Sequence, residues 1–152
     1  MYTRVVVGTD GSETAAIAVR RAIELAAAMK AELHVVHAHQ LLNLSVASVD
    51  SEAGSLSSEI SKVNSGLRHE SDDICERAVR EAKQAGVSAF AHSVAGDPTD
   101  ALVTVAESVQ AQVIVIGNRG MAGMKRFVLG SVPNKVSHHS PCDVLIVYSK
   151  IN

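Results

Sequence analysis

Short runs of β-branched and aliphatic residues alternate along this chain with longer segments whose apolar positions recur at helical spacing. Each short run ends in turn formers, as Val5-Val6-Val7 does before Gly8. Strands are therefore predicted over residues 5–7, 33–38, 89–95, 113–116 and 144–147. Helices are predicted over about 12–29, 68–85 and 98–109, with a short one ending near residue 139. This alternation indicates an α/β fold with a parallel sheet.

Residues suited to helix ends support these boundaries. Ser12 can cap the first helix with its hydroxyl oxygen. Asp97 followed by Pro98 is a cap with proline at the first helical position. Gly86 stands where the second long helix is expected to end.

The segment from about residue 40 to residue 66 differs from the rest of the chain. It carries eight serines, no aromatic residue and little periodicity. We expect a mobile surface loop there. Because there is no internal repeat and the length of 152 residues suits one ordinary domain, a single domain is predicted over residues 1–152.

Composition narrows the classes of partner. Aromatic residues make up 3% of the chain and the formal net charge is -2, which argues against nucleic acid and anionic membrane surfaces. The start does not resemble a signal peptide, and the apolar runs are too short to cross a bilayer. Cys75 and Cys142 lack the spacing of a metal or disulfide framework. We expect a cytoplasmic protein with no membrane partner.

Candidate chemistry lies in two segments that follow predicted strands. Parallel sheets bind ligands at the carboxyl ends of their strands, where the strand order reverses. Residues 8–12 and residues 117–131 occupy such positions. In the second segment glycines let backbone N–H groups approach an anion, and Gly130-Ser131 stands at a predicted helix start, where phosphate binds well. Arg119, Lys125 and Arg126 add positive charge, so this segment has the chemistry of a phosphate cradle.

The cradle is neither a Walker P-loop nor a Rossmann fingerprint, since it has no Gly-Lys pair and follows a late strand. Its pattern G-x2-G-x9-G-[S/T], from Gly117 to Ser131, resembles the ATP-binding signature of the universal stress protein family. The stretches 5–12, 95–98 and 140–147 resemble that family as well. The resemblance implies a three-layer, Rossmann-like fold of the adenine nucleotide alpha hydrolase-like type. Its five-stranded parallel sheet has the order 3-2-1-4-5, with a nucleotide between strands 1 and 4.

The resemblance also implies which residues meet the nucleotide. Gly8 and Thr9 would line the adenine side, with Asp10 near the ribose or the phosphate–metal region. The backbone of Ala38 would meet the adenine edge, and Ile116 would pack beside it. The residues implied for the ribose and phosphates are Gly117, Arg119, Gly120, Gly130, Ser131 and Val132. Pro133 departs from many nucleotide-binding members, which have Ser or Thr there, and it removes a hydroxyl and an amide donor.

The predicted function is that of an ATP-binding regulator in a stress response, with or without Mg²⁺. A cAMP- or AMP-binding protein and a slow ATPase remain alternatives. No nucleophile motif is present, so no catalytic residue is assigned, and Asp10 is the only candidate base. On its own, Asp10 is better explained as a turn or cap residue. His34, His37 and His39 lack a carboxylate at ligand spacing, and so do His138, His139 and Cys142, which argues against metal sites in either group.

The last predicted strand, Val144 to Val147, would form a sheet edge in the order 3-2-1-4-5. A bare apolar edge favours pairing with another strand. The family resemblance points to antiparallel pairing of this strand across a two-fold axis, so a homodimer is predicted.

Overall fold

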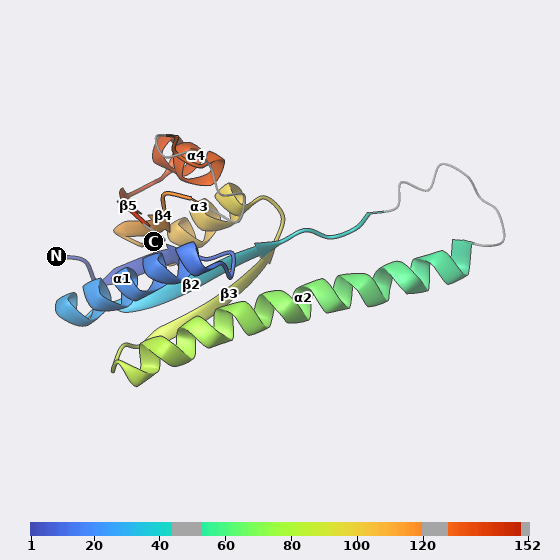
Figure 1. Cartoon of the computed structure of the whole chain (residues 1–152), viewed down its shortest axis with the longest axis horizontal. Coiled ribbons are helices and arrows are strands. Elements are labelled where there is room, and N and C mark those ends of the chain that lie inside the picture. Colours follow the sequence, from blue (N-terminus) through green and yellow to red (C-terminus); the bar gives the residue numbers. More distant parts are fainter. Residues whose placement is uncertain (44–52, 120–127, 150–152) are drawn as a thin grey trace.

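The computed structural model describes residues 1–43, 53–119 and 128–149 as an alternation of strands and helices. In chain order the elements are β1 (Arg4–Gly8), α1 (Glu13–Met29), β2 (Glu32–His39), α2 (Ala53–Gln84), β3 (Ala89–Ala95), α3 (Pro98–Ser108), β4 (Val113–Gly117), α4 (Ser131–His139) and β5 (Asp143–Val147). The strands form one parallel sheet in the order β3-β2-β1-β4-β5 (Figure 1). The predicted fold class and strand order are confirmed.

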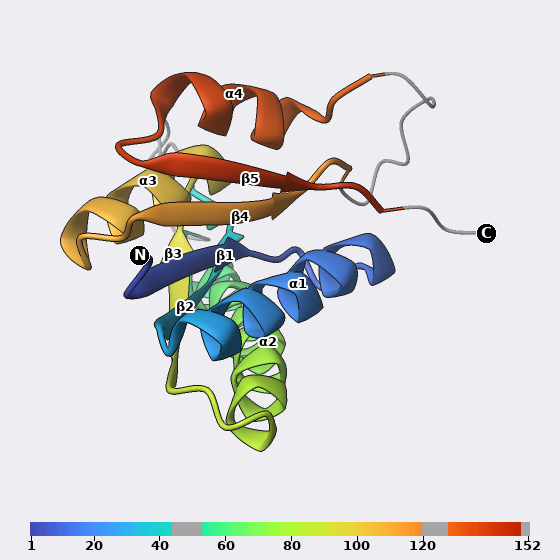
Figure 2. The same ribbon diagram turned by 90° about the vertical axis from the view of Figure 1, so that its left-hand side faces the viewer.

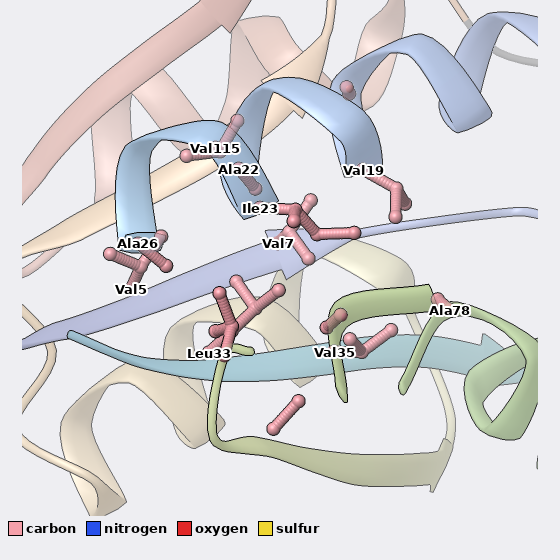
Figure 3. Close-up of a cluster of buried hydrophobic side chains, with 14 of the residues drawn as sticks. Val5, Val7, Val19, Ala22, Ile23, Ala26, Leu33, Val35, Ala78 and Val115 are labelled. Atoms are coloured by element: carbon pink, nitrogen blue, oxygen red, sulfur yellow. The ribbon is translucent and has the colours of Figure 1, made fainter. Parts of the chain in front are cut away.

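Helices cover both faces of the sheet, with α1 and α2 on one side and α3 and α4 on the other (Figure 2). The apolar run of β1 serves both layers because successive side chains point to opposite faces. Val5 and Val7 join the core under α1 and α2, whereas Val6 joins the core under α3 and α4. In Figure 3 Val7 lies beneath Ile23 and Val5 lies beside Ala26, both residues of α1, with Leu33 of β2 below them.

The predicted caps are present. Ser12 Oγ accepts a hydrogen bond from the amide of Ala15 at 3.1 Å. Asp97 Oδ1 accepts from the amide of Thr99 at 2.8 Å, and Pro98 opens α3. Gly86 adopts φ +78° just beyond α2, a backbone conformation that side chains oppose.

The predicted loop at 40–66 is wrong from Ala53 onward, where α2 already begins. Its part at 44–52 lies outside the described residues. The count of serines hid apolar positions at 56, 60, 63 and 67, whose spacing is helical. The added turns of α2 extend past the sheet (Figure 1). Asn64 there pairs through its side chain with the backbone N–H and C=O of Leu42, at 2.8 and 3.1 Å, which ties the end of the β2 segment to the helix.

Of the helices in the described ranges, none is long and apolar enough to cross a membrane.

Candidate functional site

A cleft of about 340 Å³ opens at the carboxyl ends of β1 and β4, on the two sides of the point where strand order reverses. The sequence-predicted residues that line it are Gly8, Thr9, Asp10, Ala38, Ile116, Gly117, Arg119, Gly130, Ser131 and Val132. Gly120 lies outside the described residues, as do Lys125 and Arg126. The structure therefore brings two sequence-distant loops together around one cavity, where nucleotide sites of parallel sheets are found.

Sequence reasoning missed the apolar walls of this cleft. The lining also includes Ala15, Val36, Pro98 and Leu102, beside Pro133, whose position at the site was predicted. The glycine at position 8 explains how α3 comes so close, since a Cβ there would lie 3.1 Å from Leu102 Cδ2. A glycine at the end of a buried strand was the available signal for this close approach.

The end of the cleft that the family resemblance assigns to the adenine base, called the base end below, lies where β2 runs on beyond β1. Gly8 pairs with Val36, and the amide of Thr9 donates to the carbonyl of Val36 at 3.0 Å. On the other side of β2, the amide of Gly96 donates to the carbonyl of His39 at 2.9 Å. Since backbone groups of successive strand residues point to opposite neighbours, the N–H and C=O of Ala38 face the side that β1 has left open. They offer one donor and one acceptor to a ligand in the cleft.

The Asp10 turn is held internally. Asp10 Oδ1 accepts from both the amide and the hydroxyl of Ser12, at 3.0 and 2.5 Å. Thr9 Oγ1 accepts from the amide of Gly11, and Gly11 adopts φ +79°. The interpretation of Asp10 as a turn residue is thus confirmed, and Asp10 also lines the cleft.

The opposite end of the cleft, which the family resemblance assigns to the phosphates and which is called the phosphate end below, lies at the start of α4. Gly130 is its N-cap, with φ -58°, a backbone conformation that other residues also adopt. The amide of Gly130 donates to the carbonyl of Asn118 at 3.0 Å and is therefore not a free donor. Ser131 and Val132 follow at the first helical positions, where amides have no acceptor within the helix. Pro133 contributes no amide, so two N–H groups and the Ser131 hydroxyl remain for an anion.

Asn118 joins the two ends of this loop, and no sequence motif predicts that role. Besides its carbonyl contact with Gly130, its amide donates to the carbonyl of Val147 at 2.9 Å. Its side-chain Oδ1 accepts from the amide and the hydroxyl of Ser149, at 3.0 and 2.8 Å. The start of α4 is therefore fixed to the ends of β4 and β5.

Arg119 supplies a cation beside these donors. It lines the cleft, and its Nε is buried without a hydrogen-bond partner among the described residues. A buried guanidinium nitrogen without an acceptor is costly, and phosphate oxygens are its preferred partners. The donor set of this end, with Ser131 and Val132, therefore fits a phosphate group.

The histidines make contacts of another kind. His37 and His39 both hydrogen-bond Ser71 of α2, while His34 Nδ1 lies 3.0 Å from His92 Nε2. Burial lowers the pKa of His34, His37 and His92 below the ordinary value. In the described part of the chain no three His, Cys, Asp or Glu side chains gather as metal ligands would.

Comparison with known proteins supports the nature of this cleft. The sequence profile of the Universal stress protein family matches residues 1–148. Universal stress protein YxiE of Bacillus subtilis is 32% identical over 97% of this chain and 99% of its own. Universal stress protein Rv1636 of Mycobacterium tuberculosis is 35% identical over 97% of each chain. A universal stress protein solved in complex with cAMP is 37% identical, with a TM-score of 0.70 over 98% of this chain and 99% of its own.

Proposed function

The chain belongs to the universal stress protein family, and on this premise we propose that its cleft binds an adenine nucleotide to regulate a stress response. The observation that carries the proposal is the pairing of two kinds of donor in one cavity. Ala38 presents a free strand edge at one end, and Ser131, Val132 and Arg119 present anion donors at the other. A nucleotide has a base edge and a phosphate at matching ends.

The first proposed ligand is ATP, with Mg²⁺ bound through the phosphates. Asp10 is the only carboxylate in the described lining and would supply an oxygen near the metal. Mg²⁺ commonly takes one or two protein carboxylates and completes its shell with phosphate and water, so a single aspartate fits that role.

A second candidate is cAMP, which a specific observation favours. The Gly130 amide is already bonded to Asn118, and Pro133 has no amide. The remaining donors at the start of α4 are enough for one phosphate but few for three. A relative solved with cAMP shares 37% of its residues with this chain, and AMP would place the same single phosphate there.

We propose that the protein works by binding rather than by catalysis. The only candidate base, Asp10, already accepts two hydrogen bonds from Ser12, which occupy one carboxylate oxygen. Hydrolysis would also need a positioned water. A slow ATPase activity would appear as ADP that accumulates with time.

The proposed assembly is a homodimer through β5. This strand ends the sheet, Leu145 on it is 42% exposed, and among the described residues no strand pairs with its outer edge. Antiparallel pairing with a second copy would satisfy these backbone groups. Leu145→Lys should shift the protein toward monomer in multi-angle light scattering, and a parent that is monomeric at micromolar concentration would contradict the dimer.

The cytoplasm is the proposed compartment. Cys75 and Cys142 are free thiols, and burial raises the pKa of the Cys75 thiol to about 11, so it is protonated and unreactive at neutral pH.

Nucleotide content and titration test the function. Purified protein should release an adenine nucleotide on heat denaturation, identified by chromatography, and calorimetric titration should rank ATP, AMP and cAMP. Tight ATP binding supports the first candidate, and a clear preference for cAMP supports the second. A protein that binds none of the three would overturn the proposal.

A further inference from the structure

A buried polar cluster lies where α2 covers the end of β2. Ser71 Oγ lies 2.6 Å from His37 Nδ1 and 3.2 Å from His39 Nδ1. Ser93 of β3 donates a hydrogen bond to the same oxygen at 2.7 Å. Ser71 is completely buried and His39 is buried as well, so these hydrogen bonds lie largely in the interior.

The hydroxyl of Ser71 is fully used by these contacts. It has one proton to donate and two lone pairs that accept. Since Ser93 donates to it, one imidazole accepts the Ser71 proton and the other donates to the second lone pair. A side chain without a hydroxyl at position 71 would leave both imidazole Nδ1 atoms without this partner in the interior.

These two histidines flank Ala38, the residue whose backbone faces the base end of the cleft. On the cleft side of this segment β1 has ended, so no strand holds it there. Its restraints include the pairing with β3, through His37–Ser93, Ala38–Val94 and His39–Ala95, and the two imidazoles that contact Ser71.

We infer that Ser71 is a positioning residue for base recognition, which fixes the N–H and C=O of Ala38 through His37 and His39. This inference rests on the proposed function. Ser71 is not one of the residues that line the cleft, and it acts from the opposite face of the sheet. It gives α2 a role in selecting the base, separate from the phosphate cradle.

The next turn of α2 braces the neighbouring part of the cleft. Ile74 packs so closely under Gly11 that a Cβ on the glycine would lie 3.1 Å from Ile74 Cδ1. One short stretch of α2 thus supports both the Asp10 turn and the Ala38 segment.

The test compares Ser71→Ala with Val79→Ala, a buried position two turns further along the same helix. Hydrogen–deuterium exchange on the ligand-free protein should show faster exchange of residues 37–39 in Ser71→Ala only. Titrations with ATP, GTP, cAMP and cGMP should show the adenine preference reduced about tenfold, the equivalent of one lost hydrogen bond. Val79→Ala should lower Tm while leaving exchange at 37–39 and base preference as in the parent.

The possible results distinguish the role of Ser71 from the proposed binding of a nucleotide. Unchanged exchange at 37–39, or faster exchange with the parent's base preference, would overturn the role of Ser71. A parent that binds neither ATP nor cAMP would overturn the proposed function instead, while the ligand-free exchange would still decide whether Ser71 holds residues 37–39. If Ser71→Ala does not fold, Ser71→Cys keeps a side chain of similar size with a weaker hydrogen-bonding group and should show the same changes to a smaller extent.

Discussion

The two ends of the cleft are built by different means. The phosphate end gathers its donors locally, from Ser131 and Val132 at one helix start, and Asn118 ties that start to the strands beside it. The base end has no donor motif. It is a piece of strand that outruns its neighbour and is held from behind by Ser71.

For the proposed nucleotide, this difference predicts which end of the cleft recognises the phosphates and which end recognises the base. A local cradle responds to charge and to the number of phosphates, because its donors all face one anion. A strand edge reads the pattern of donors and acceptors on the base. Substitutions at the two ends should therefore change different quantities: total affinity at one end and base preference at the other.

The largest effect is expected from Gly130→Glu. A Cβ at this position would lie 3.3 Å from the carbonyl of Asn118 and 3.4 Å from the ring of Pro133, and the carboxylate would repel a phosphate at the helix start. Calorimetric titration should show a loss of at least about a hundredfold for ATP and cAMP alike. Ser137→Glu, which adds the same charge on the exposed side of α4, is the control and should bind like the parent. Parent-like affinity in Gly130→Glu would remove the cradle from the site.

A smaller effect is expected from Ser131→Ala. The substitution removes one hydrogen bond to a charged group, worth about 1.5–3 kcal/mol, or roughly ten- to a hundredfold in affinity. The ratio of adenine to guanine affinity should stay as in the parent, because the base end is untouched. His139→Ala, on an exposed position at the end of the same helix, should change neither quantity. A change of base preference in Ser131→Ala would contradict the assignment of base preference to the other end of the cleft.

The smallest effect concerns pH and the histidines behind the base end. Burial lowers the pKa of His37, and the neighbouring His39 lowers it further, against the opposing charges of Asp10 and Glu70. Burial also lowers the pKa of His34 and His92, which face each other across β2 and β3. A histidine with a lowered pKa binds its proton less readily folded than unfolded. Its contribution to stability is present above the unfolded value and is lost as the pH falls below it.

Urea denaturation should therefore give a lower free energy of unfolding at about pH 5 than at about pH 7, with the loss beginning near the unfolded histidine pKa of about 6.5. His37→Asn, which keeps a polar atom where Nδ1 lies, should reduce this loss. An equal loss in parent and variant would place the pH dependence on other groups.

Some of this arrangement could be predicted from the chain because it is local. The spacing from Gly117 to Ser131 is a local pattern, and so are the caps at Ser12 and Asp97, which determine boundaries through neighbouring residues. The start of α2 is harder to predict, because the many serines of this segment obscure the helical spacing of its apolar positions.

Other parts depend on contacts across the sequence. Ser71 meets His37 and His39 from more than thirty residues away, as the separations of 34 and 32 positions record. Leu102 reaches the cleft only because α3 packs against Gly8. Contacts of this kind form through tertiary packing, so no local sequence pattern predicts them.

We propose that one ligand spans both ends of the cleft. A two-dimensional ¹⁵N NMR titration of the parent with ATP and, separately, with cAMP tests this directly. The amide resonances of Ala38 and Ser131 should shift together along one binding curve, whereas inorganic phosphate should shift the Ser131 resonance and leave that of Ala38 in place. Resonances of Ala38 that stay in place while Ser131 saturates with nucleotide would contradict it.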